Sequence, residues 1–168
     1  MSTPRARAYR IAVIGAGSAS AEERYLARAV GQLLAESGAV VVCGGRSGVM
    51  EAVAEGAAEA QGISVGLLPD DDDTQANRWL TVALPTGLGE ARNALVVRAA
   101  EAAIAIGGGW GTLSEISLAS KMGIGVTTLG TPPAPTEALG VPASDGPAEA
   151  VAWAIEQASG YRKRLERA

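Results

Sequence analysis

The chain has 168 residues, a length that fits one ordinary domain with a sizeable core, and we predict a single domain over 1–168 with its core at about 10–160. Apolar residues make up 48% and aromatic residues only 4%, so the core has to be built mainly from Ala, Val, Leu and Ile. The net charge is -4 without a broad basic face for nucleic acid, and the absence of histidine excludes the usual zinc sites and histidine-dependent nucleophiles.

The single cysteine, Cys43, lies in the apolar run 40–43. An internal disulfide is therefore excluded, and a buried thiol in a reducing compartment is expected. The apolar stretch 11–14 is too short for a signal-peptide core or a membrane span, so we expect a cytoplasmic protein with no membrane partner. Basic residues near the C-terminus predict a solvated helix end: Arg162, Lys163, Arg164 and Arg167.

Short β-branched runs alternate with Ala-rich stretches along the chain. This alternation predicts an α/β fold, a Rossmann-like parallel sheet flanked by helices on both faces. Ser20 and Glu23 have the spacing of a capping box at the start of the first helix. The first predicted elements are strand 11–14, loop 15–20, helix 21–37, strand 39–43, loop 44–48, a helix ending near 61, and strand 63–68.

The acidic run 70–73 is expected to be a solvated turn rather than a metal site. Trp79 and Trp153 are expected in the core, whereas Trp110 either lies over a bound ring or covers its own glycine loop. The remaining predicted elements are strand 79–84, loop 85–89, helix 90–101, strand 102–106, helix 112–122, strand 124–129, a surface connection over 131–147, and helix 148–159.

Three loops that follow predicted strands are rich in glycine: 15–20, 44–48 and 107–111. Loops after parallel strands gather at one edge of the sheet, which is the expected ligand crevice. Glycines allow close approach of the backbone, and each following helix presents free N–H groups, so a phosphate is the expected guest. A redox dinucleotide is disfavoured because the first loop lacks the third glycine of that fingerprint and no acidic residue ends the second strand.

Thr112 and Glu115 permit two interpretations. In one, Thr112 caps the helix and Glu115 returns to its backbone N–H as a capping box. In the other, Thr112 and the loop amides hold a phosphate, while Glu115 faces ribose hydroxyls or a developing positive charge. Arg92, followed by Asn93, is either a surface residue or a forked donor to a phosphate or base in the crevice.

Three segments, "CGGRSGVMEAVAEGA", "PTGLGEARN" and "AEAAIAIGGGWGTLSE", together resemble the Rossmann-like superfamily of the LONELY GUY phosphoribohydrolases and the molybdenum cofactor carrier proteins. The resemblance spans about residues 10–130. Its most specific part is the run of glycines, Thr112 and Glu115, similar to the Pro-Gly-Gly-x-Gly-Thr-x-x-Glu signature of the hydrolases. In them the glycines and threonine bind the 5′-phosphate of a nucleotide, and an arginine and this glutamate form the catalytic pair, which Arg92 and Glu115 match.

Three departures bring the resemblance closest to the carrier-protein branch. Gly107 stands in place of the proline, Asn93 in place of a lysine, and Glu51 in place of a glycine. The ligand of the carrier proteins is a pterin with a terminal phosphate. Members of the superfamily have been labelled lysine decarboxylases, but neither Lys121 nor Lys163 lies on a strand-end loop where a Schiff base would form.

Two functions follow from these motifs. The first is binding of a phosphorylated heterocycle, a nucleoside monophosphate or the molybdenum cofactor, with no cofactor that the sequence itself requires. The alternative is hydrolysis of a nucleoside 5′-monophosphate to base and ribose 5-phosphate, with Arg92 and Glu115 catalytic. The resemblance also implies a homodimer or larger homo-oligomer. The residues expected to contact the ligand are Gly15, Gly17, Ser18, Gly44, Gly45, Arg92, Asn93, Gly108, Gly109, Gly111 and Thr112.

Overall fold

The computed structural model describes residues 7–167; residues 1–6 and 168 of the predicted domain lie outside this part. One parallel sheet has the strand order β4-β3-β2-β1-β5-β6-β7. Its strands are β1 (Arg10–Gly15), β2 (Val40–Cys43), β3 (Ile63–Leu68), β4 (Val82–Pro85), β5 (Ala102–Ile106), β6 (Gly125–Leu129) and β7 (Ala143–Ser144). The helices are α1 (Ala21–Glu36), α2 (Val49–Glu59), α3 (Asn93–Arg98), α4 (Trp110–Lys121) and α5 (Pro147–Leu165), with short 3-10 turns η1 (Gly89–Arg92) and η2 (Thr136–Leu139).

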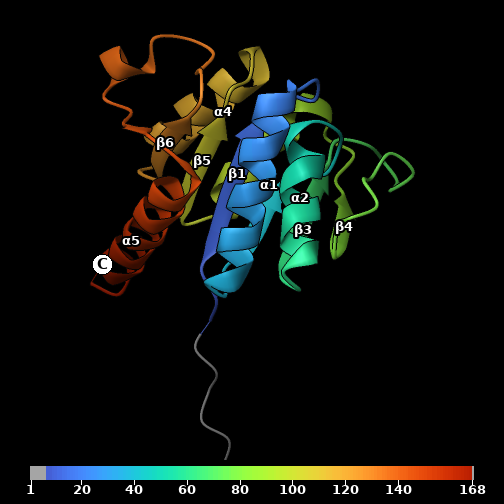
Figure 1. Ribbon diagram of the computed structural model, residues 1–168, viewed down its shortest axis with the longest axis horizontal. Coiled ribbons are helices and arrows are strands. Elements are labelled where there is room, and N and C mark those ends of the chain that lie inside the picture. Colours follow the sequence, from blue (N-terminus) through green and yellow to red (C-terminus); the bar gives the residue numbers. More distant parts are fainter. Residues whose placement is uncertain (1–6, 168) are drawn as a thin grey trace, which may run out of the picture.

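Helices cover both faces of the sheet, as the α/β pattern predicts. Helices α1, α2 and α5 lie together on one face, which is turned toward the viewer in Figure 1. Helices α3 and α4 pack on the other face. Each face of the sheet has its own hydrophobic core, and alternate residues of β1 pack in the two cores. Ile11 and Val13 lie in one of them, while Ala12 and Ile14 lie in the other. The small side chains bring helices and strands close together.

The strand order reverses direction at β1, which lies between β2 and β5. Strands β2, β3 and β4 extend the sheet to one side, while β5, β6 and β7 extend it to the other. Ligands of open α/β sheets bind at the carboxyl edge beside such a reversal, because the loops on either side diverge there. The fold therefore places the glycine loops after β1, β2 and β5 around one point.

Most element boundaries agree with the sequence, and the Ser20–Glu23 capping box is present with both of its hydrogen bonds. The predicted helix 90–101 is wrong in extent, because the chain forms η1 and then the short α3 before β5. The predicted connection 131–147 contains η2 and β7, which pairs with β6 through only two residues. So short a strand carries no periodicity that a sequence could reveal.

The prediction of a strand over 79–84 with Trp79 in the core is wrong. Trp79 lies in a turn and is only half-buried, with the Arg78 guanidinium 4.8 Å from the centre of its ring. The turn is held by Asn77, whose side chain accepts a hydrogen bond from the Trp79 N–H and donates to the carbonyls of Gly45 and Arg46. This side-chain turn delays the start of β4 to Val82. Trp153, in contrast, packs against the core from α5.

Helix α5 continues past the predicted end at residue 159, and the prediction of a solvated helix end is wrong for Arg162. Its guanidinium makes two hydrogen bonds to the buried carboxylate of Glu101, at 2.6 and 2.8 Å. It also donates to the carbonyls of Arg7 and Ala8 and lies 4.3 Å from the ring centre of Tyr9. This cluster joins the segment before β1, the start of β5 and the end of α5.

No helix within residues 7–167 is both long enough and apolar enough to cross a membrane.

Candidate functional site

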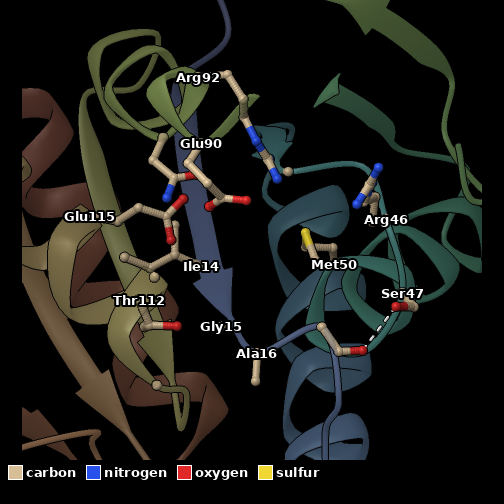
Figure 2. A pocket seen from close by; sticks show the side chains of 15 residues that line it. Ile14, Gly15, Ala16, Arg46, Ser47, Met50, Glu90, Arg92, Thr112 and Glu115 are labelled. Atoms are coloured by element: carbon tan, nitrogen blue, oxygen red, sulfur yellow. Dashed lines mark hydrogen bonds between the residues drawn. The ribbon is translucent and has the colours of Figure 1, made fainter. Parts of the chain in front are cut away.

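A cavity of about 360 Å³ opens at the carboxyl edge of the sheet, where the strand order reverses. Its volume lies within the range of small-molecule sites. Figure 2 shows that its walls come from the segments after β1, β2 and β5, together with η1 and the start of α3. The residues that line it are Ile14, Gly15, Ala16, Gly17, Gly44, Arg46, Ser47, Met50, Glu90, Arg92, Asn93, Gly109, Gly111, Thr112 and Glu115.

The N-terminus of α4 forms one wall of the cavity. The helix begins at Trp110 with Gly109 as its N-cap, and no side chain in the described part of the chain caps it. Of the two interpretations of Thr112 and Glu115, the capping box is therefore wrong, since Thr112 lies inside the first turn and Glu115 in the second. Because the first backbone N–H groups of a helix have no partner within it, Gly111 and Thr112 bring free donors and the positive end of the helix dipole to the cavity.

The glycines around the cavity fall into two groups. A side chain at Gly15 would collide with Val49 and the carbonyl of Ile106, and one at Gly44 with Met50 and the Arg92 guanidinium. Because Gly15 and Gly44 have no side chain, the loops that contain them can pack closely against these neighbours. A Cβ at Gly109 would meet no atom within 4 Å, and one at Gly111 would only approach the Asn93 amide at 4.0 Å. These open positions leave room for a ligand to approach the backbone.

Arg92 is the most deeply buried cation of the site. It ends η1 with only 7% of its surface exposed, and its Nη1 donates to the carbonyl of Leu67 at 2.9 Å. Its Nε is buried without a hydrogen-bond partner among residues 7–167. Burial lowers the pKa of Arg92, although the charges of Glu115 and Glu90 oppose the change. A buried cation with an unsatisfied donor is costly unless a ligand completes its hydrogen bonds.

Glu115 lies across the cavity from this cation. It is 7% exposed, and burial raises its pKa to about 8, an effect that Arg92 opposes and the Glu90 carboxylate reinforces. No direct ion pair joins Arg92 and Glu115 among the described residues, although both line the same cavity. Figure 2 shows the carboxyl groups of Glu115 and Glu90 directed into the cavity. The site thus combines an uncapped helix N-terminus with a buried carboxyl whose pKa is raised.

The opposite wall comes from the loop after β2 and the first turn of α2. Arg46 lines the rim and is held by Asp70, with two Nη2 to carboxylate distances of 2.5 and 2.7 Å. Ser47 donates to the carbonyl of Gly17 at 2.9 Å, which joins the first two glycine loops. Met50 presents its thioether to the cavity next to Gly44.

The structure brings together nine of the twelve candidate site residues: Gly15, Gly17, Gly44, Arg92, Asn93, Gly109, Gly111, Thr112 and Glu115. Ser18 is exposed and lies outside the cavity wall. Gly45 has a positive φ of 78° and packs on Leu68, and Gly108, with a φ of 107°, packs on Thr112. Trp110 is 88% exposed and lines no part of the cavity.

Among the cavity residues that sequence reasoning missed, four can contact a ligand through their side chains: Arg46, Ser47, Met50 and Glu90. The first two lie inside the glycine loop 44–48, so that loop itself could have indicated them. Glu90 is two residues before Arg92, but the helix predicted there gave no reason to turn both side chains to one side. The structure instead places both residues in η1, and both line the cavity.

Comparison with known proteins identifies relatives along nearly the whole chain. Residues 8–154 match the SLOG cluster4 family. A protein from Archaeoglobus fulgidus is 42% identical over 146 residues, which cover 87% of this chain and 94% of that protein.

Two solved structures are similar in both fold and sequence. The molybdenum cofactor binding protein from Rippkaea orientalis superposes with a TM-score of 0.85 at 33% identity, covering 89% of this chain and 97% of that one. The molybdenum cofactor carrier protein from Chlamydomonas reinhardtii has a TM-score of 0.83 at 31% identity, covering 92% of this chain and 99% of that one. These findings confirm the resemblance to the carrier-protein branch that the glycine motifs predicted. The chain belongs to the SLOG cluster4 family.

Proposed function

We propose that this protein binds a phosphorylated heterocyclic ligand of the molybdenum cofactor type in the cavity at the carboxyl edge of the sheet, and that it acts as a carrier. The observation that supports this most is that one cavity combines an uncapped helix N-terminus with Arg92, a buried arginine that makes a single hydrogen bond, to Leu67, among residues 7–167. The phosphate of the ligand accepts hydrogen bonds from the N-terminal amides of α4. The similarity of this chain to a molybdenum cofactor binding protein and a molybdenum cofactor carrier protein of known structure supports the same assignment.

The residues of the cavity fit such a ligand. Gly109 and Gly111 leave the backbone open where a phosphate would approach, and Thr112 adds a hydroxyl in the first helical turn. Arg92 also lines the cavity, so its guanidinium brings a positive charge to the ligand. The pterin of such a ligand would itself carry the metal. The protein therefore has only to hold the organic part of the ligand and exclude water from it. The cavity of about 360 Å³ is of the size that encloses most of such a small molecule.

The direct experiment mixes the purified protein with molybdenum cofactor released from a molybdoenzyme and separates the complex by gel filtration. Equal molar amounts of molybdenum and protein in the eluted peak are expected. Thr112→Val, which keeps the shape of the side chain and removes its hydroxyl, should retain less cofactor. Ser117→Ala, an exposed hydroxyl on the same helix, is the matched control and should retain as much as the unaltered protein. Protein that elutes free of cofactor would contradict the proposal.

Hydrolysis of nucleoside 5′-monophosphates is the second candidate function, and the raised pKa of Glu115 favours it. A carboxyl with a pKa of about 8 can donate its proton to a departing base at neutral pH. Arg92, in the same cavity, would then anchor the substrate or stabilise negative charge on the base. Chromatography of AMP and related nucleotides after incubation should show free base that disappears in Glu115→Ala. If the nucleotide binds but no free base appears, hydrolysis is contradicted and only the carrier function remains.

A homodimer or larger homo-oligomer, expected from the resemblance, also stays a prediction. Light scattering during gel filtration measures the molar mass directly. A peak at twice the chain mass of 16.9 kDa or above would support it, and a peak at the chain mass would contradict it.

A further inference from the structure

The cavity contains two glutamates, an unexpected composition for a site that holds a phosphate. Glu90 enters from η1 and Glu115 from α4, and both line the cavity beside Arg92. The charge of Glu90 acts on Glu115, so the two carboxyl groups are close enough to interact. The negative charge of Glu90 would repel a phosphate at this end of the cavity. The two carboxyl groups therefore mark a part of the cavity that receives another portion of the ligand.

The order of side chains along the cavity separates these two parts. In Figure 2, Thr112 lies toward one end, Glu90 and Arg92 lie toward the other, and Glu115 lies between them. Thr112 and Glu115 are three residues apart on α4, which corresponds to a rise of about 4.5 Å along the helix axis. A ligand whose phosphate sits on the first turn of α4 thus extends past Glu115 toward Glu90 and Arg92.

The hydrogen-bonding groups at that end define the edge of a ring that would fit. Arg92 lines this end of the cavity, and its guanidinium offers only donors. Glu90 and Glu115 offer carboxyl oxygens, and the pKa of Glu115 falls toward its ordinary value when a ligand presents N–H groups to it. The matching edge carries a carbonyl oxygen, a ring N–H and an amino group in a row. Guanine and pterins share this edge, whereas adenine has an amino group beside a ring nitrogen that only accepts.

Met50 supplies the remaining contact that a flat ring needs. Its thioether borders the cavity on the wall formed by α2, and sulfur makes favourable contacts with aromatic rings.

We propose that Glu90, Glu115 and Arg92 form a ring-recognition wall that selects phosphorylated ligands carrying the 2-amino-4-oxo edge of pterins and guanine. This inference rests on the proposed function, because it assigns the phosphate to α4 and the ring to the acidic end. Selection requires both carboxyl groups, one for the ring N–H and one for the amino group.

Calorimetric titration with four compounds tests the wall, and all four carry the same phosphate: GMP, IMP, AMP and ribose 5-phosphate. IMP differs from GMP only in lacking the amino group, and ribose 5-phosphate has no ring. GMP should bind at least about tenfold more tightly than IMP or AMP, because a site built to accept an N–H loses that hydrogen bond with the analogue. Ribose 5-phosphate should bind most weakly.

Two variants localise the effect. Glu115→Gln and Glu90→Gln should each weaken GMP by about tenfold and change ribose 5-phosphate little, since an amide presents N–H groups to the donors of the ring. Glu156→Gln, an exposed glutamate on α5, is the matched control and should leave both affinities unchanged. Circular dichroism confirms that each variant is folded, and the ligand comparison on the unaltered protein stands without them.

The outcomes separate this inference from the proposed function. Equal affinities for GMP, IMP and AMP, with measurable binding of ribose 5-phosphate, would overturn the ring-recognition wall and leave the phosphate site intact. Failure of all four compounds and of the molybdenum cofactor to bind would overturn both. A GMP preference that survives in Glu115→Gln and Glu90→Gln would also overturn the wall, because another part of the chain would then read the ring.

Discussion

Replacing Glu115 by glutamine should stabilise the protein increasingly as the pH rises. The carboxyl is buried beside Glu90 and lacks a direct ion pair with Arg92 among the described residues. Glutamine keeps the shape of the side chain and removes its charge. In addition to Arg92 and Glu90, the thiol of Cys43 interacts with this carboxyl from β2, but burial raises the pKa of that thiol to about 11, so it stays neutral.

The sign follows from the two pKa values of Glu115. Its pKa is about 8 in the folded protein against an ordinary 4.5, so the folded state holds the proton more tightly than the unfolded chain does. Stability from this group is fully present below pH 4.5, is lost as the pH rises, and is gone above pH 8. The difference between the two pKa values corresponds to at most about 5 kcal/mol, and a rise from pH 5 to pH 7 to about 3 kcal/mol.

Urea unfolding of Glu115→Gln and the unaltered protein between pH 4.5 and 8.5 measures this effect. The difference in free energy of unfolding should grow steadily in favour of the variant and level off above pH 8. Glu156→Gln, with its exposed carboxyl on α5, should show no such trend. A difference between Glu115→Gln and the unaltered protein that is constant over the whole range would refute the assignment of a buried, protonated carboxyl to the cavity.

Three further predictions follow from particular contacts. Gly111→Ala should raise the free energy of unfolding by up to about 1 kcal/mol, because alanine favours the helix, and thermal unfolding measures this effect. The added Cβ should also weaken binding of ribose 5-phosphate about tenfold, because Gly111 lines the cavity, and calorimetry measures this loss. Arg162→Ala should lower the free energy of unfolding by about 2 kcal/mol, measured in urea, because the buried carboxylate of Glu101 loses two hydrogen bonds. Cys43 should react with a thiol reagent at pH 8 only as fast as the protein unfolds, and rapid labelling of the native protein would contradict its burial and raised pKa.

The strands near the centre of the sheet could be predicted well, because continuous apolar runs between glycine loops leave few alternatives. The runs 63–68 and 102–106 form strands with the predicted bounds. At the edge, the run 79–84 combines β-branched and aromatic residues with a turn that Asn77 imposes through long-range hydrogen bonds to another loop. Local β-propensity does not depend on such long-range contacts, so it predicts the start of this strand three residues before the structure has it.

The candidate site could be predicted as a set of loops but not as a set of contacts. Parallel strands bring the glycine loops to one edge whatever their details, and this explains why Arg92 and Glu115 line the same cavity. The cap at Thr112 failed because the helix starts two residues earlier, at Trp110, where a glycine N-cap is as acceptable as threonine. The role of Arg162 could not be foreseen, since its partner Glu101 is 61 residues away in the chain.

The central claim is that the cavity recognises a ligand by its phosphate. Binding of the phosphorylated pterin precursor of the cofactor should be compared with binding of the same pterin after phosphatase treatment, by calorimetry on the unaltered protein. We expect one phosphorylated ligand per chain and at least a hundredfold loss of affinity, about 2.7 kcal/mol, without the phosphate. Equal affinity for the two forms would contradict it.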